Sequence, residues 1–283
     1  AREIALAKEP VDTEIKLEKK PQFSLTLHQE AAPHGPKVNL EFARATENIK
    51  IPQKVDKIVN DDLKASEGLQ VLHKKGFDEH YLTKIFSTGN LGLKGNKKLV
   101  PTRWSITAVD DTLGKGLIEE IKDFKTGEYC AYFSGYLGNY YLILCFPETW
   151  SYELFEIGVT SGEYSTDHEW YTGRKDYATE TVGGYYAARL SILQRLQQEK
   201  KQSAILALRF ITDEYWAPLG VWVCRESSKK SMNTAPIYFS SMDEMMNYAI
   251  TFARERFKYD ITGILKESKL YNQLKKQKKL WEY

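Results

Sequence analysis

Cysteine is scarce in this sequence, and its three copies, Cys130, Cys145 and Cys224, lie far apart in apolar runs. No CxxC pair occurs, so a zinc site with the usual ligand spacing is not expected. An odd number of cysteines also favours a reducing compartment over a disulfide framework. We therefore expect a fold that depends on neither metal ions nor disulfides.

Long apolar runs are missing as well. No stretch of about 18 consecutive apolar residues occurs, which is the length that a membrane-spanning helix needs. The chain begins at Ala1 without a charged and then apolar leader, so no secretory signal is expected. The GxSxG, Walker and GxGxxG patterns of common enzyme classes are also absent. We expect a cytoplasmic protein without a membrane partner or a cofactor, and a non-enzyme rather than an enzyme.

An excess of charge of one sign is also lacking, because the positive and negative residues nearly balance and leave a net charge of only +2. The net charge therefore gives no indication of nucleic-acid binding. Aromatic residues, in contrast, are plentiful: the chain has 18 Tyr, 12 Phe and 6 Trp. A chain of 283 residues with this composition can bury a substantial core. Disorder is therefore expected only in segments.

The first 60 residues are polar and rich in Lys, Glu and Pro. Within them, residues 14–18 and 23–27 alternate polar and apolar side chains, which predicts a β-hairpin. A second region, 61–175, opens with two short helical patterns joined by a turn at Gly76 and finished by about residue 90. This helix pair has the outline of a helix-turn-helix.

The rest of the region 61–175 predicts one helix and a set of strands. Residues 106–109 fit a short strand or a helix lead-in, and Asp110 and Asp111 can cap a helix that runs to about residue 124. Three aromatic and branched runs follow and predict an antiparallel meander. These runs are 129–133, 140–146 and 150–157.

Residues 176–263 predict a further unit of mixed structure. An amphipathic helix fits 183–198, strands fit 204–210 and 219–224, and a capping-box pattern starts a helix at about residue 242. Residues 264–283 are rich in lysine and predict a helix extension or a loose, flexible tail. The whole pattern predicts an α+β fold with antiparallel sheets and packed helices.

The tail ends in a pattern typical of peptides that dock on a replication sliding clamp. Gln277 is followed by Leu280 and Tyr283 at intervals of three, with Trp281 between them. In a 3₁₀ turn, residues three apart eclipse, so the aliphatic and aromatic side chains form one apolar plug. A solubilising lysine-rich terminus is the alternative interpretation. Two bulky aromatics at a terminus still need a cover, which is either the protein's own core or a partner.

Residues 98–112, KLVPTRWSITAVDDT, strongly resemble the signature of the archaeal Nre family of DNA-repair proteins. Supporting matches are 136–139, 173–175, 183–190 and 220–226. The resemblance implies a role in DNA repair near the nucleoid, and a clamp-binding peptide of the PCNA-interacting type at the C-terminus. It also implies a Cys-rich N-terminal segment in many members, which this sequence lacks.

Several basic residues are candidates for DNA contact. In residues 94–104, lysines and Arg103 could neutralise phosphates while Trp104 stacks on an unpaired base. The alternative is a solvated loop with Trp104 in the core. Arg174, Arg189 and Arg225 could converge on a phosphate, or form internal ion pairs. The full set of candidates comprises Lys94, Lys97, Lys98, Arg103, Trp104, Arg174 and Arg189.

Three hypotheses for function remain open at this point. The first is a repair accessory factor that the clamp recruits and that contacts DNA. The second is a metal-dependent nuclease in which Asp110 and Asp111, joined by Glu180, hold Mg²⁺. Asp at a helix start is nevertheless favoured by capping alone. The third is a DNA-binding scaffold without catalysis.

Overall fold

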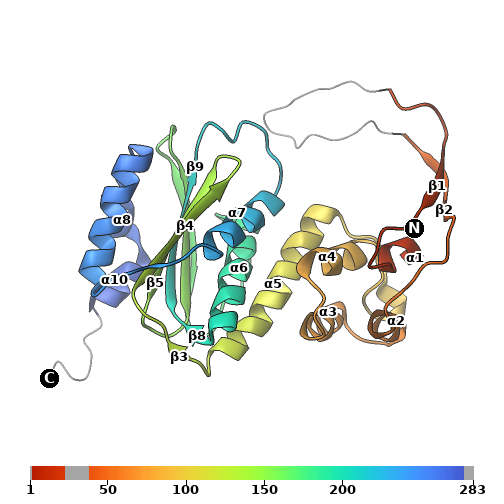
Figure 1. Cartoon of the computed structure of the whole chain (residues 1–283), viewed down its shortest axis with the longest axis horizontal. Coiled ribbons are helices and arrows are strands. Elements are labelled where there is room, and N and C mark those ends of the chain that lie inside the picture. Colours follow the sequence, from red (N-terminus) through yellow and green to blue (C-terminus); the bar gives the residue numbers. More distant parts are fainter. Residues whose placement is uncertain (1, 23–37, 277–283) are drawn as a thin grey trace. The chain divides into compact units, whose positions relative to one another are not determined.

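The computed structural model describes residues 2–22 and 38–276. The chain divides into two compact units: unit 1 comprises Ala1–Leu113 and Ala217–Gly220, and unit 2 comprises Gly114–Trp216 and Val221–Tyr283. Helices and strands occur in both, which confirms the expected α+β class. Unit 1 is mainly helical, and unit 2 is built on a six-stranded sheet (Figure 1).

Unit 1 contains short elements joined by tight turns. In the described residues these are α1 (Arg2–Leu6), β1 (Thr13–Leu17), β2 (Leu40–Ala45), α2 (Gln53–Asn60), α3 (Ala65–Lys74), α4 (Glu79–Ser87), the 3₁₀ turn η1 (Lys94–Asn96) and the first part of α5 (Thr102–Ile121). The expected helix pair is present as α3 and α4. Gly76, with φ of 88°, makes the turn between them, and the Asp78 side chain caps α4 by accepting from the Tyr81 N–H at 2.8 Å. A helix-turn-helix role for this pair stays a prediction.

The strand β1 pairs with β2 in antiparallel register, with Ile15 opposite Ala43. This pairing was not expected from the sequence, and the hairpin expected between residues 14–18 and 23–27 stays a prediction. Residues 23–27 themselves lie outside the described residues. The segment 40–45 was missed because its glutamate and arginine interrupt the apolar alternation that marks a strand.

Helix α5 begins at Thr102, so the prediction of a helix start at Asp110 is wrong. The carbonyl of Pro101 accepts from the N–H groups of Trp104 and Ser105 at 3.0 and 2.9 Å, which opens the helix eight residues earlier. A run of β-branched residues at 106–109 favoured a strand locally. Buried Val109, Leu113, Leu117 and Ile121 recur at intervals of four, and this apolar stripe outweighs the local preference.

The sheet of unit 2 has the strand order β10-β4-β5-β9-β6-β7. Its strands are β4 (Cys130–Tyr136), β5 (Asn139–Phe146), β6 (Ser151–Gly158), β7 (Tyr164–Glu169), β9 (Ala204–Ile211) and β10 (Ile237–Tyr238). A separate parallel pair is formed by β3 (Lys125–Thr126) and β8 (Lys201–Gln202).

The expected antiparallel meander is corrected by the position of β9. This strand lies between β5 and β6, antiparallel to the first and parallel to the second. Its residues 204–210 are all buried, as the continuous apolar run requires of a strand covered on both faces. Strand β6 therefore lies beside β9 instead of β5.

Helices cover both faces of this sheet (Figure 1). On one face α7 (Trp222–Met232) packs on β4 and β5 and beside α6 (Val182–Glu199). On the other face Leu142, Leu144 and Phe146 pack with Met245 and Ala249 of α8 in one core cluster. The bounds of the helices on this second face are α8 (Met242–Phe257), α9 (Thr262–Glu267) and α10 (Lys269–Lys276).

Two further expectations in unit 2 are corrected. Residues 222–232 are the helix α7, although the apolar run 219–224 favoured a strand. Short apolar runs fit a buried helix and a buried strand equally well, which explains the error. Residues 264–276 form most of α9 and all of α10 and bury Ile264, Leu265 and Leu270, so this part is not a loose tail.

Glu153 of β6 fixes α10 to the sheet. Its carboxylate accepts from the Ser268 hydroxyl at 2.5 Å and from the N–H groups of Lys269 and Leu270 at 3.0 and 3.1 Å. It therefore satisfies free N–H groups at the start of the helix and is itself almost fully buried. Burial raises the pKa of Glu153, although these hydrogen bonds act in the opposite direction.

Every helix within residues 2–22 and 38–276 is too short or too polar to cross a membrane.

Candidate nucleic-acid interface

The basic segment, residues 94–104, is held firmly against the helices of unit 1. The Val100 N–H donates to the Ser87 carbonyl at 2.9 Å, and the Lys97 ammonium donates to the Val59 carbonyl at 2.5 Å. Gly89, with φ of 70°, lies so close that an added Cβ would be 2.6 Å from the Lys98 carbonyl oxygen. The backbone of this segment is thus positioned by α2 and by the end of α4.

The side chains of the basic segment are largely open to solvent. Trp104 is 59% exposed, which contradicts the alternative that places it in the core. The Arg103 guanidinium lies 5.6 Å from the centre of the Trp104 ring. Lys94 and Lys98 are exposed, whereas Lys97 is half-buried. Exposed cations around an exposed indole can contact phosphates and stack on a base.

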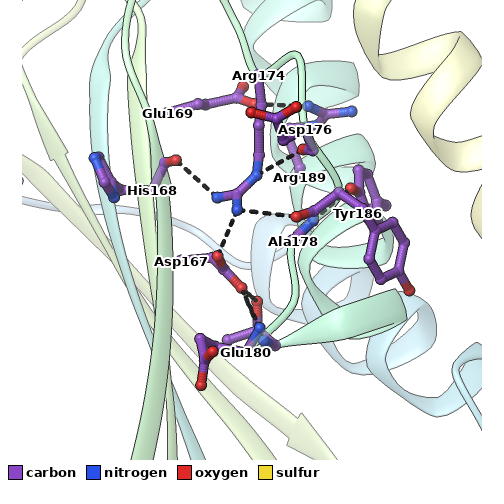
Figure 2. Close-up of polar contacts among 11 residues, drawn as sticks. Asp167, His168, Glu169, Arg174, Asp176, Ala178, Glu180, Tyr186 and Arg189 are labelled. Carbon is purple, nitrogen blue, oxygen red and sulfur yellow. Dashed lines mark hydrogen bonds and ion pairs between the residues drawn. The ribbon is translucent and has the colours of Figure 1, made fainter.

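Arg174 organises a loop of unit 2 that follows β7 (Figure 2). Its guanidinium donates to the carbonyls of Asp176, His168 and Tyr177 at 2.8, 3.1 and 3.1 Å. It also pairs with Asp167 at 2.8 Å. With its donors used in this way, Arg174 closes the loop, which is the internal role that the sequence left open.

Asp167 joins this loop to the start of α6 (Figure 2). Its second oxygen accepts from the Glu180 and Thr181 N–H groups at 3.0 and 2.8 Å and from the Thr181 hydroxyl at 3.0 Å. These bonds precede Val182, whose φ of 41° is a costly conformation for a β-branched residue. Asp167 therefore acts as a cap that holds a strained helix start.

Arg189 of α6 lies beneath this loop in a fully buried ion pair (Figure 2). It contacts Glu169 at 2.7 Å, and neither side chain has exposed surface. The indole N–H of buried Trp150 donates to the other oxygen of Glu169 at 3.1 Å. Arg189 has no access to a phosphate in this structure, and the buried Arg225 has almost none.

A second buried charge pair was not anticipated from the sequence. Arg209 of β9 pairs with Glu156 of β6 at 2.5 Å and donates to the Asn139 side-chain oxygen. An added Cβ on Gly184 would be 2.4 Å from a Glu156 carboxylate oxygen, so α6 approaches this pair closely. The signal was present: charged residues inside two apolar strands, an arginine in β9 and glutamates in β6, indicate buried partners.

The loop closed by Arg174 also presents aromatic residues that the sequence analysis did not single out. Trp170, Tyr171 and Tyr177 are each more than a third exposed. The Lys122 ammonium lies 5.0 Å from the ring centre of Tyr171. Aromatic residues in a charged, exposed loop belong to the surface types that contact partners.

The acidic residues proposed as metal ligands do not form the expected site. Asp110 is fully buried within α5, and Asp111 follows it inside the same helix rather than at a strand-to-helix junction. Glu180 is an exposed residue of unit 2. Over the described residues, no three His, Cys, Asp or Glu side chains gather in a way that could hold a metal ion.

The predicted clamp peptide, with Gln277, Leu280, Trp281 and Tyr283, lies outside the described residues.

Family models match almost the whole chain. A model described as "Archaeal Nre, N-terminal" matches residues 1–165, and one described as "Archaeal Nre, C-terminal" matches residues 169–283. The chain belongs to the archaeal Nre family. No solved structure matches this Nre chain.

Curated Nre relatives cover most of the chain. The DNA repair protein NreA of Archaeoglobus fulgidus is 37% identical over 259 residues, which are 88% of this chain and 65% of that protein. NreA of Haloferax volcanii is 38% identical over 240 residues, 80% of this chain and 57% of that protein. NreB of A. fulgidus is 30% identical over 293 residues, 100% of this chain and 73% of that protein. The chain thus spans less than two thirds of the length of either NreA.

The Nre-like segments now have places in the fold. Residues 98–112 form the end of the basic segment and the first half of α5, and 173–175 lie in the loop that Arg174 closes. Residues 183–190 are the buried start of α6. The segments 136–139 and 220–226 reach the β4–β5 turn and the start of α7.

Proposed function

We propose that this chain is a DNA-repair accessory factor that a PCNA-type sliding clamp recruits through residues 277–283 and that contacts DNA through the basic segment. The observation that carries the proposal is membership of the Nre family, whose curated relatives are named DNA repair proteins. Two features of the chain support its details, the terminal peptide pattern and the exposed basic segment.

The terminal pattern supplies the docking group. Gln277 can form hydrogen bonds at the rim of a pocket, while Leu280 and Tyr283 fill it and Trp281 adds apolar surface. A few such anchors give an affinity of about 1 μM, or roughly 8 kcal/mol. Helix α10, which ends at Lys276 directly before the pattern, is capped by Glu153. The peptide therefore follows a fixed element.

The basic segment supplies the DNA contact. Lys94, Lys98 and Arg103 are exposed cations of the segment that also carries the exposed Trp104, and its backbone is tied to α4. Binding through such cations should weaken steeply with added salt. We expect Lys98→Ala with Arg103→Ala to lower the affinity for DNA and to reduce its salt dependence. Unchanged affinity at low salt would remove the basic segment from the interface.

A nuclease that uses Asp110 and Asp111 as metal ligands is not favoured. Asp110 and Asp111 lie inside α5 instead of at a strand-to-helix junction, and within the described part of the chain no three His, Cys, Asp or Glu side chains gather to hold a metal ion. The Asp110 side chain has no exposed surface.

The test of recruitment is clamp binding by the full chain, by a variant lacking the last seven residues, and by Leu280→Ala with Tyr283→Ala. We expect both variants to lose binding in isothermal titration while their melting temperatures match that of the parent. Lys278→Ala with Lys279→Ala is the matched control, because it alters the same peptide without removing an anchor. Retained binding after deletion contradicts the proposal, and a fall of several degrees in melting temperature shows that the peptide packs in the core.

A further inference from the structure

Unit 2 carries an open hollow of about 640 Å³ at one end of its sheet. Its walls come from the last residue of β4 and from one side of α7. The lining residues are two aromatics, two lysines, one acid and one amide: Tyr136, Trp222, Lys229, Lys230, Glu226 and Asn233. None of these was a candidate for DNA contact, and none lies in the basic segment.

Helix α7 presents these side chains as a single stripe. Residues 222, 226, 229, 230 and 233 recur at helical spacing along one face and its C-cap. The opposite face is buried and includes Val223, Cys224, Ser227 and Met232. The helix therefore uses one side for packing, and its other side carries the exposed Trp222 and Lys230 and the partly exposed Lys229.

The two aromatic rings are held near each other at the mouth of the hollow. Trp222 and Tyr136 lie edge to face with their ring centres 6.4 Å apart, and they are 36% and 41% exposed. The Ser227 hydroxyl donates to the Tyr136 carbonyl at 3.1 Å, which ties the end of β4 to α7. The Lys230 ammonium lies 5.9 Å from the centre of the Tyr136 ring. Rings and cations thus share one small surface.

The turn next to Tyr136 is strained at an exposed apolar residue. The two-residue loop between β4 and β5 is Leu137–Gly138, with φ angles of 49° and 71°. Asn or Asp is the usual first residue of such a turn, because leucine pays a steric cost there. Leu137 is nevertheless 44% exposed. An exposed, strained leucine beside an exposed tyrosine is a feature that suggests contact with a partner.

We infer that this hollow binds an unpaired nucleotide of single-stranded DNA. The base stacks on the exposed face of Trp222 and contacts the Tyr136 ring, which lies at 60° to it; such stacking tolerates any sequence because every base has an aromatic face. Lys229 and Lys230 neutralise the flanking phosphates. Glu226 and Asn233 lie at the lining where the amino and carbonyl groups of a base edge can form hydrogen bonds. The inference rests on the proposed role in DNA repair and adds a second DNA site, in unit 2.

The chemistry of the lining favours unpaired DNA over other polyanions. An acidic peptide would meet the lysines, but Glu226 would repel it and it offers no face for stacking on two rings. A DNA duplex keeps its base faces stacked inside the helix and presents only phosphates and base edges. Two exposed rings add binding energy only to a base that has left its stack.

The test compares binding of a fluorescent oligo-dT and of a duplex of the same length to the full chain at low salt. We expect Trp222→Ala to weaken oligo-dT binding by about 5- to 100-fold, and Tyr136→Ala by a similar factor, with a much smaller effect on the duplex. Trp222→Phe should restore most of the binding, because a phenyl ring still stacks. Lys229→Ala with Lys230→Ala should reduce the salt dependence.

The matched control is Tyr238→Ala, which removes a 59% exposed aromatic from β10 beside the opposite end of β4. Circular dichroism establishes that each variant is folded, and Tyr136→Ala carries the test if Trp222→Ala does not fold. Equal losses for oligo-dT and duplex, or the same loss for Tyr238→Ala, overturn the inference. Binding of poly-glutamate that Trp222→Ala removes would assign the hollow to an acidic peptide and also overturn it.

A failure here is distinguishable from a failure of the proposed function. If Trp222→Ala leaves oligo-dT binding unchanged while Lys98→Ala with Arg103→Ala lowers it, the hollow is not a DNA site and the basic segment is. If oligo-dT does not bind at all, the inference is wrong, and clamp binding by residues 277–283 still tests recruitment separately.

Discussion

Glu169 and Arg189 form an ion pair inside unit 2, and neither side chain is exposed. Few charged side chains in proteins are fully buried in this way. Removing one member of a buried pair leaves the other charge without compensation. We expect Arg189→Met to lower the free energy of unfolding by about 3–5 kcal/mol. Urea unfolding followed by circular dichroism measures this change.

The double variant Glu169→Leu with Arg189→Met is the control for this pair. It removes both charges, so we expect it to be more stable than Arg189→Met alone. A role in binding DNA would give the opposite picture. Arg189→Met would then reduce DNA affinity while the free energy of unfolding stayed near that of the parent.

Glu153 gives a prediction for pH. Because burial raises the pKa of Glu153 in the folded state, that state binds the proton more tightly than the unfolded chain does. The contribution of Glu153 to stability is therefore largest at low pH, and it falls as pH rises from about 4.5 through the folded-state pKa. We expect the parent to lose stability relative to Glu153→Gln across this window. Urea unfolding of both proteins at several pH values provides the comparison, and a gap that widens in favour of the parent with rising pH would contradict it.

At the scale of elements, the link between α4 and the basic segment depends on Gly89. An added Cβ there would meet the Lys98 carbonyl at 2.6 Å, and φ of 70° is also unfavourable for alanine. We expect Gly89→Ala to cost about 1–3 kcal/mol and to displace residues 98–100. Thermal unfolding reports the cost, and changed amide shifts in the basic segment report the displacement.

Variants at two other glycines distinguish the cost of an unfavourable φ angle from the cost of a steric clash. Gly76 has a φ of 88° but no atom within 4 Å of an added Cβ, so Gly76→Ala should cost only the strain, about 1 kcal/mol. Gly95 has neither problem, and Gly95→Ala should be nearly neutral. If all three variants lose the same stability, the close approach at Gly89 has no special importance.

The sequence predicted the elements that have a capping residue at their start or a continuous apolar run along their length. Ser241 caps a helix as its capping-box pattern predicted, and the apolar run 204–210 is a strand. The position of β9 between β5 and β6 could not be predicted, because strand partners far apart in sequence leave no local pattern. The composition of the basic segment left open whether Trp104 lies in the core, and the structure shows it 59% exposed. The pairing of Arg189 with Glu169 could not be predicted either, since an arginine in a helix looks the same whether it faces water or a buried acid.

At the scale of the whole molecule, the two family-model segments are not separable bodies. The first ends at residue 165 and the second begins at residue 169, and both limits fall within β7. Strand β9 belongs to the second segment but pairs with β5 and β6 of the first. The six-stranded sheet therefore needs both segments.

We expect a fragment of residues 169–283 to lack cooperative unfolding, because β9 would expose both of its edges and a continuous apolar strand. Near-ultraviolet circular dichroism and a thermal scan of the isolated fragment measure this. Co-expression with residues 1–165 should restore a folded complex. A cooperative transition in the isolated fragment would show that its helices can build a core without the other strands.

If a clamp binds residues 277–283 as proposed, the cap that Glu153 places on α10 also limits how far that clamp can stand from the sheet. From Lys276, seven extended residues reach at most about 25 Å, whereas a chain released from Ser268 onward would reach roughly twice as far. Local concentration falls approximately as the inverse three-halves power of tether length, so a frayed α10 would dilute the tethered partner about threefold. In that case a single carboxylate on a strand sets the distance over which the bound partner can move.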